Sequence, residues 1–525
     1  MIEQNRRRVT PKYKQMTFET AVRNPERYKS ILTSIYSFEN RVLDDKTLLE
    51  TVSSLYLNGI VSSEGVEINE ISTIESISPQ VIEVNSTRKA DGGFPEGYAS
   101  RFWTYMRTLS ELGFVYTQYN EQFRFSEITK KLIGNELDEQ EAFSIQAMKY
   151  NRKSPYRNIL NDFNYFKFIV GILKKREKIS YEQFIISTFS ENGNLKEFFK
   201  IIDNNTFNDN SEVEVFLRKQ YQTNLKAQTI LRDYPDVVLR LLIITGFISI
   251  QFRGKVLIYL NQNKSEYLND LLNIPIDINT KEKESPKLHF EKLETFNEDL
   301  LKIVFKHREK EVKIDGFDYT RKVSEIIKLY ELNEALLLDS ITYIGAAKNV
   351  IPAFKYIAEP LKLEFYISLL LALKYGNELG IRPNYKADYI GLPISHAPGN
   401  TGDIEVYSNE IYWLIEVTLI RNKNQQLNSE TTSVIRHFIQ DDKLNNYLSK
   451  YLSFVAPVIH PDTKNYYDYS IVQLRVDRQI DKQNVYLKPY NIGEFIRITV
   501  DKKNFEDMKQ YTNNILQSFK EKINR

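Results

Sequence analysis

The chain of 525 residues contains no cysteine, and this absence limits its chemistry. Without thiols it can form neither disulfide bonds nor the cysteine-ligated zinc sites of zinc fingers. The sequence also lacks any run of 18 apolar residues, and residues 1–8 have no apolar core of the kind that a signal peptide needs. We therefore expect a cytoplasmic protein with no membrane segment.

A strong charge of one sign is missing as well, because 71 Lys and Arg face 69 Asp and Glu. The overall charge therefore does not indicate a nucleic-acid-binding protein, and any such surface must come from local clustering. Two basic clusters are candidates: Arg6, Arg7, Arg8, Lys12 and Lys14, and Lys149, Arg152, Lys153 and Arg157. Each is open to the alternative interpretation of a solvated basic segment.

Residues 402–419 predict two strands joined by a polar turn, with carboxylates where a core strand should carry none. Asp403 and Glu405 alternate with apolar residues in the first strand, as Glu416 does in the second, so each strand presents its acids on one face. Asp403 and Glu416 are expected to converge across the hairpin. Burying a carboxylate in an apolar run is costly unless it is paired or holds a cation, and oxygen ligands suit Mg2+ or Mn2+.

The alternative for this hairpin is a surface β-ribbon with its acids in solvent. Trp413 and the β-branched residues around it favour a buried sheet. Two interpretations of Glu405 remain open. It either contacts the metal ligands without binding the metal itself, or it is simply an exposed acid.

The segment Gly402-Asp403-Ile404-Glu405-Val406, followed by Ile415-Glu416-Val417-Thr418-Leu419, resembles the PD-(D/E)XK nuclease motif. More narrowly, it resembles the AlwI family of type IIS restriction endonucleases and their nicking relatives. The resemblance implies that Asp403, Glu416 and the backbone carbonyl of Val417 hold Mg2+, for which Mn2+ is expected to substitute. Thr418 stands where many of these nucleases carry Lys, so the group that assists the attacking water stays open.

Glu364 lies in a predicted helix over residues 360–375, which has Pro360 in its first turn and Gly376 beyond its end. The helix is apolar almost all round and is therefore expected to be buried. Glu364 either complements the helix dipole or, as the resemblance implies, joins Asp403 and Glu416 at the metal.

Glu430 follows the second strand, where the resembling family has an acidic site residue. It is equally well placed as an ordinary residue at a helix start. Glu430 or a nearby glutamine, Gln425 or Gln426, would orient the nucleophile. The five histidines show no metal-ligand spacing, and each is expected to be structural or exposed.

A succession of helix, glycine, strand, turn and strand occurs twice, over residues 100–125 and 236–260. This is the shape of a winged helix, which serves either DNA binding or protein interaction. The predicted fold class is therefore multidomain α+β, with helical winged-helix-like DNA-recognition domains before an α/β PD-(D/E)XK restriction-endonuclease-like domain. The predicted boundaries are 1–140 and 141–285 for recognition, 286–345 for a helical connector and 346–525 for the endonuclease domain.

Taken with the resemblance, these features predict a type IIS restriction endonuclease that cleaves double-stranded DNA a few base pairs outside an asymmetric site. The alternatives within the class are a strand-specific nicking enzyme and the large subunit of a heterodimeric restriction enzyme. The alternatives outside it are a non-catalytic winged-helix regulator and an RNA or repair nuclease. One catalytic constellation cuts one strand at a time, so a double-strand break needs a transient homodimer, a small catalytic partner subunit or sequential re-docking.

Overall fold

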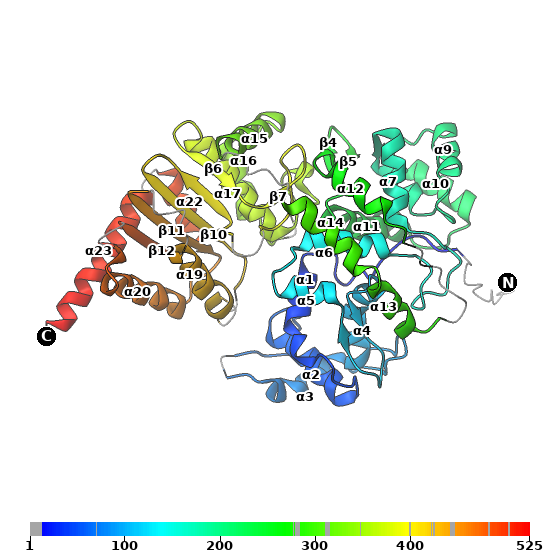
Figure 1. Cartoon of the computed structure of the whole chain (residues 1–525), viewed down its shortest axis with the longest axis horizontal. Helices are drawn as coiled ribbons and strands as arrows, with labels where there is room; N and C mark the ends of the chain where they lie inside the picture. The colour runs from blue at the N-terminus through cyan, green and yellow to red at the C-terminus, as the bar shows by residue number, and fades with distance from the viewer. Residues whose placement is uncertain are drawn as a thin grey trace, which may run out of the picture. The chain divides into compact units, whose positions relative to one another are not determined.

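The computed structural model describes residues 13–524 apart from short gaps. The gaps are residues 70, 277, 279–283, 310–315, 347, 398–400, 422, 424–425, 441–446, 481–483 and 502–503, together with the side chains of 309, 316–318, 428–430, 437 and 440. The chain divides into two compact units, Met1–Glu311 and Val312–Arg525, each shown in Figure 1. Within the described ranges, no helix is long and apolar enough to cross a membrane.

The first unit is mainly helical. Its helices are α1 (Arg27–Ser34), α2 (Asp45–Leu57), α3 (Ile74–Asn85), α4 (Tyr98–Glu111), α5 (Glu127–Ile133), α6 (Glu139–Lys149), α7 (Tyr165–Arg176), α8 (Tyr181–Ser187), α9 (Leu195–Asn204), α10 (Asn210–Tyr221), α11 (Tyr234–Ile244), α12 (Ser265–Asn273), α13 (Pro286–Glu294) and α14 (Asn297–Glu309). Its strands are β1 (Val115–Tyr116), β2 (Arg124–Phe125), β3 (Lys178–Ser180), β4 (Ile248–Phe252) and β5 (Val256–Leu260).

Both repeats of helix, glycine and hairpin are present in this unit. Helix α4 is followed by Gly113 at φ 79° and by the antiparallel pair β1–β2. Helix α11 is followed by Gly246 at φ 73° and by the antiparallel pair β4–β5. The short strand β3 adds to the second hairpin by pairing with β5, and its three residues are too few to give a periodic signal in the sequence. The order of elements is as predicted, while the assignment to the winged-helix class stays a prediction.

The segment 286–345 is shared between the two units. Helices α13 and α14 pack within the first unit, where the ring of Phe290 lies 5.8 Å from that of Tyr116 and Asn297 accepts a hydrogen bond from the buried Lys149 at 2.6 Å. Helices α15 (Gly316–Leu329) and α16 (Glu334–Thr342) belong to the second unit and contact α17 (Glu359–Tyr375). The unit boundary therefore falls inside the predicted connector.

The second unit is built on a mixed five-stranded sheet in the order β12-β11-β10-β9-β6. Its strands are β6 (Gly380–Pro383), β9 (Ile404–Tyr407), β10 (Ile411–Val417), β11 (Ser449–Ala456) and β12 (Val485–Asn491), and a separate short pair is formed by β7 (Lys386–Ala387) and β8 (Pro393–Ser395). Strand β10 pairs antiparallel with β9 and parallel with β11. It is thus an inner strand, and the interpretation of this hairpin as a solvent-exposed ribbon is wrong.

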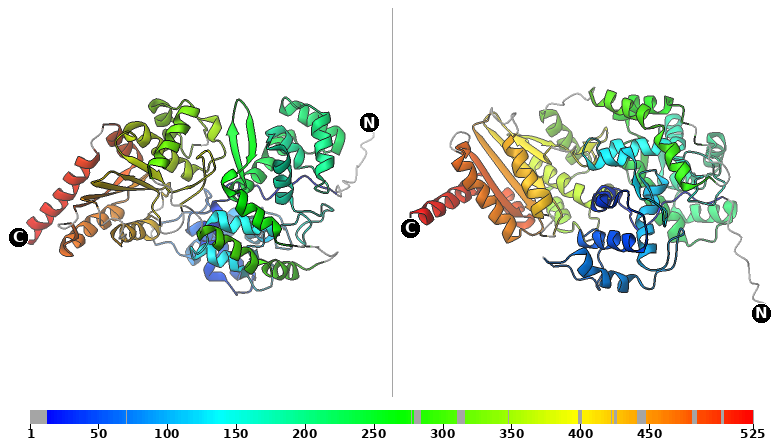
Figure 2. Two further views of the ribbon diagram at one scale, coloured as in Figure 1. Left: turned by 45° about the horizontal axis from the view of Figure 1, so that its top comes forward. Right: turned by 60° about the horizontal axis from the view of Figure 1, so that its bottom comes forward.

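Helices cover both faces of this sheet, as the two views of Figure 2 show. Trp413, Ile415 and Val417 of β10 pack in the same core as α17, whereas Tyr412 and Leu414 pack with α19 (Thr432–Gln440) and α20 (Pro461–Val476). Helices α22 (Ile492–Val500) and α23 (Asn504–Ile523) complete the unit. The alternation of strand side chains thus divides β10 between two cores.

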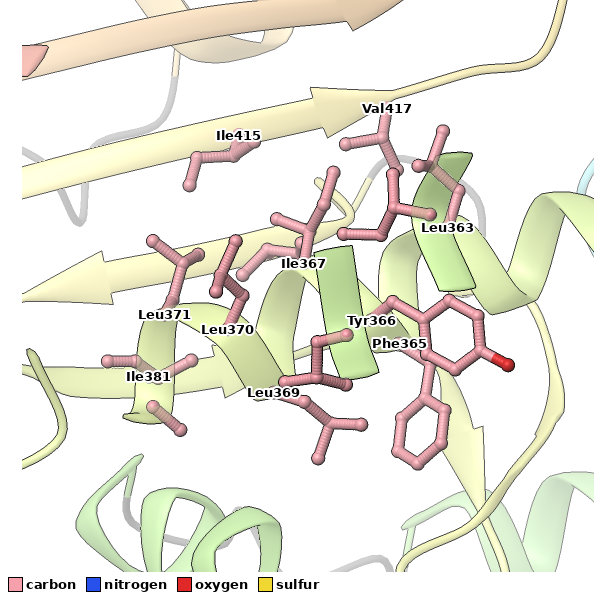
Figure 3. Packing of buried hydrophobic residues seen from close by; sticks show 14 of the residues in the cluster. Leu363, Phe365, Tyr366, Ile367, Leu369, Leu370, Leu371, Ile381, Ile415 and Val417 are labelled. Carbon is pink, nitrogen blue, oxygen red and sulfur yellow. The ribbon is translucent and has the colours of Figure 1, made fainter. Parts of the chain in front are cut away.

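Helix α17 confirms the buried helix predicted over 360–375. Twelve consecutive residues from Leu361 to Ala372 are buried, Pro360 is in the first turn and Gly376 follows the last residue. In Figure 3, Leu363 and Ile367 of α17 lie beneath Ile415 and Val417 of β10. The start of the helix is therefore close to the end of the strand that carries Glu416.

Candidate active site

Asp403 and Glu416 lie opposite each other at one end of the β9–β10 hairpin. The last register pair is Ile404 with Ile415, so the next position along the ladder sets Asp403 against Glu416. The Asp403 carboxylate reaches across the hairpin, and its Oδ2 accepts a hydrogen bond from the backbone N–H of Val417 at 2.8 Å. Both acids are half-buried. The convergence expected from the alternation of residues is therefore present.

The Glu416 carboxylate lies against the backbone of Gly402. A Cβ atom on Gly402 would be 2.9 Å from Oε1 of Glu416 and 2.2 Å from Cδ1 of Leu414. Gly402 is thus next to both Leu414 and Glu416, which lie two positions apart in β10 and therefore point to the same face of the sheet. That face is covered by α19 and α20. A side chain at 402 would require the ends of the Leu414 and Glu416 side chains to move.

Glu364 lies on α17, the helix that packs on the other face, and its side chain is 2% exposed. Its Oε1 is 2.6 Å from Nδ1 of His396, while its Oε2 is buried without a hydrogen-bond partner in the described part of the chain. The charge of Glu364 adds to the effect of burial in raising the pKa of Tyr385 well above its usual value. His396 could not be linked to Glu364 from the sequence, because the two lie 32 positions apart and no local pattern joins them.

The donor set suits a hard divalent cation. Two half-buried carboxylates face each other at Asp403 and Glu416, and oxygen-only donors favour Mg2+ or Mn2+ over softer metals. Among the residues whose placement is described, no group of three or more His, Asp or Glu side chains is arranged to hold a metal ion. Within the described residues, the structure therefore brings Asp403 and Glu416 together but does not group Glu364 with them.

The other predicted site residues differ in their surroundings. Glu405 is half-buried and lies 3.8 Å from Arg382 in an ion pair. Glu430 lies in the helical turn Gln426–Thr431, but its side chain, like the whole of Gln425, is outside the described residues. Gln426 is fully buried, and its side-chain amide is already hydrogen-bonded. The amide nitrogen donates to the Val458 carbonyl, and the amide oxygen accepts from the Thr463 hydroxyl. It is therefore not available to orient a nucleophile.

The basic cluster at residues 149–157 is not a nucleic-acid surface. Lys149 and Arg152 are 0% and 1% exposed, and burial lowers the pKa of Lys149 to about 8. Arg152 donates to backbone carbonyls of Lys14 and Ser190, and Arg157 pairs with the buried Glu111 at 2.8 Å. Sequence spacing cannot distinguish such buried cations from exposed ones, because their partners lie far away in the chain. In the other cluster, Lys14 is exposed and the remaining members lie outside the described residues.

Most of the chain matches a known protein family. The family model described as AlwI restriction endonuclease matches residues 110–498, which include all four predicted site acids. The chain belongs to the AlwI restriction endonuclease family. A search of the curated proteins finds no match.

Two solved structures are similar to parts of this AlwI-family chain. One is the small subunit (R.BspD6I2) of the heterodimeric restriction endonuclease R.BspD6I, with 17% identity, a TM-score of 0.24, and coverage of 36% of this chain and 99% of that one. The other is the BpuJ1 endonuclease binding domain in complex with modified DNA, with 12% identity, a TM-score of 0.31, and coverage of 52% and 90%. The family match makes the protein a restriction endonuclease, a site-specific nuclease that acts on DNA.

Proposed function

We propose that this AlwI-family protein is a type IIS restriction endonuclease of the PD-(D/E)XK class. In this proposal it binds an asymmetric DNA sequence and hydrolyses a phosphodiester a few base pairs away in the presence of Mg2+. The observation that carries the proposal is the pairing of Asp403 with Glu416 at the end of an inner strand. The buried acid Glu364, whose helix begins close to that strand end, supports the same assignment.

The proposal gives each of the predicted site residues a role. Asp403, Glu416 and the carbonyl of Val417 would hold the ion, which supplies positive charge to activate water and to stabilise the phosphate as its charge develops. The Val417 N–H holds the Asp403 carboxylate in place. Glu364 would add a third acid to the site, and Glu430 would orient the attacking water, as the resemblance implies. Thr418 cannot replace the Lys of other nucleases, because a hydroxyl carries no positive charge.

Recognition and cleavage would be divided between the two compact units. The two helix-and-hairpin repeats of the first unit support a role in DNA recognition, as the winged-helix class would imply. The predicted acids all lie in the second unit. A strand-specific nicking enzyme is the second candidate. A single active site of Glu364, Asp403 and Glu416 would cleave only one DNA strand at a time.

A run-off sequencing digest tests this function. The full-length protein would be incubated with plasmid and Mg2+, and both strands would be sequenced across the cut sites. The expected result is a fixed cut position at one offset from a common asymmetric sequence, with no cutting in EDTA. Cleavage within a palindrome would contradict the type IIS assignment, and undiminished cleavage in EDTA would contradict the metal site.

A further inference from the structure

Asn384 lies immediately after β6 and holds two consecutive peptide carbonyls of the segment that leads into β9. Its side-chain Nδ2 donates to the carbonyl oxygen of Gly402 at 2.7 Å. Its backbone N–H donates to the carbonyl oxygen of Asp403 at 2.9 Å. One half-buried residue thus fixes the backbone on which the Asp403 carboxylate is carried.

Asn384 continues the β6–β9 ladder by one hydrogen-bonded pair, with Asp403. The register of β6 with β9 ends with Pro383 opposite Ile404, a non-hydrogen-bonded pair of this antiparallel ladder, so the proline removes no hydrogen bond to β9. The two donors of Asn384 supply the hydrogen bonds that follow that pair. They act at Gly402 and Asp403, where the site begins.

The other side of the same segment contacts Glu416. Gly402 is so close to the Glu416 carboxylate that a Cβ atom would be 2.9 Å from its Oε1. Gly402 is thus held at its carbonyl by the Asn384 amide and lies close to the end of the Glu416 side chain. A shift of this backbone would change the separation of the Asp403 and Glu416 carboxylates.

We propose that Asn384 is a positioning residue for the catalytic carboxylates, fixing Asp403 relative to Glu416. The inference rests on the proposed function, because it assumes that these two acids bind a divalent cation. Partners behind metal ligands set ligand orientation, and their loss costs about 10- to 100-fold in metal affinity or activity. The contact with the Gly402 carbonyl needs a donor on a short side chain, which the amide of Asn384 supplies.

The test uses the full-length protein with Asn384→Ala and Asn384→Asp. The second variant keeps the size of the side chain but replaces the donor with an acceptor. Asn349→Ala is the matched control, because Asn349 also donates its amide to a backbone carbonyl, that of Ile351, at 2.9 Å in the same unit. Mn2+ affinity is measured by titration calorimetry, and the cleavage rate is measured as a function of Mn2+ concentration. Specific DNA binding is measured in EDTA by gel shift, and the melting temperature of each variant is determined.

The expected result is a loss of Mn2+ affinity of about tenfold or more in both Asn384 variants. Cleavage falls in parallel and recovers partly at high Mn2+, while DNA binding in EDTA and the melting temperature match those of Asn349→Ala. Wild-type Mn2+ affinity in both Asn384 variants overturns the inference, and so does a loss of DNA binding together with cleavage. If the wild-type protein binds no Mn2+, or Asp403→Ala cleaves fully, the proposed function fails instead.

Discussion

Oδ2 of Asp403 accepts a hydrogen bond from the backbone N–H of Val417, at 2.8 Å, so the acid of one strand is fixed to the strand that carries Glu416. Two carboxylates held side by side repel each other unless a cation or a proton is shared between them. A cation bound by both carboxylates would relieve this repulsion.

Replacing either acid of this pair is expected to remove catalysis and to leave recognition intact. Loss of a residue that only supports a metal ligand costs up to about 100-fold in activity. Asp403→Ala or Glu416→Ala would remove a ligand itself, so cleavage should fall by more than that. Specific binding should persist because DNA affinity depends on phosphate and base contacts. Plasmid cleavage and gel shifts measure the two effects. Glu410→Ala, an exposed acid of the same hairpin, is the control and should cut normally.

Glu364 can be tested against an acid of the same helix. If Glu364 serves the site, Glu364→Ala should lower cleavage at least about tenfold in a fixed concentration of Mg2+. Glu359 lies in the first turn of α17 and pairs with Lys362 at 2.7 Å, so Glu359→Ala should alter stability but not the cleavage rate of folded enzyme. Equal, small effects of both substitutions would favour the helix-dipole interpretation of Glu364.

Local patterns predicted much of the fold, because they depend on near neighbours in the chain. Alternation over residues 403–417 predicted the hairpin, and proline, glycine and apolar spacing predicted α17. The same patterns carry no information on long-range partners. Tertiary packing determines three of the features described above. They are the contact of His396 with Glu364, the burial of Arg152 and the hydrogen bond from Asn384 to Gly402. The family match covers the site residues but leaves their individual roles as predictions.

The extent of the recognition unit can be tested with fragments. A fragment ending at residue 311 should bind the same DNA sequence as the full chain, with an affinity that falls steeply with salt. A fragment ending at Ser285 would lose Asn297 and leave the buried Lys149 without its partner, so it should be markedly less stable. Gel shifts and thermal melting distinguish these outcomes. A folded 1–311 fragment that binds no specific sequence would show that recognition needs the second unit.

The stability of the first unit is expected to fall in mild acid. Burial lowers the pKa of His289 from its usual 6.5 to about 4, with Lys292 adding to the effect. The unfolded chain therefore binds a proton that the folded chain does not as the pH falls from about 7 to 4, and stability is lost over that window, by an amount on the order of 3 kcal/mol. Denaturant unfolding at several pH values measures the slope. His289→Gln should flatten it, whereas His460→Gln in the second unit should not.

The number of strands cut can be read from plasmid topology. We expect a double-strand break, and if it requires two catalytic domains its rate should rise more than linearly with enzyme concentration. Linear plasmid would then accumulate after an open-circle intermediate. A nicking enzyme would instead leave open circles at high enzyme concentration, with the nick always on one strand, and that result would replace the double-strand assignment.

The position of β10 between β9 and β11 has a consequence for how this family can vary in length. A residue inserted or deleted within Ile411–Val417 would send Glu416 to the opposite face and detach it from Asp403, because strand side chains repeat every two residues. The three residues between β9 and β10 are under no such constraint, since the ladder on both sides is already fixed. Relatives that keep the activity should therefore differ in length at this turn and agree in length along the strand.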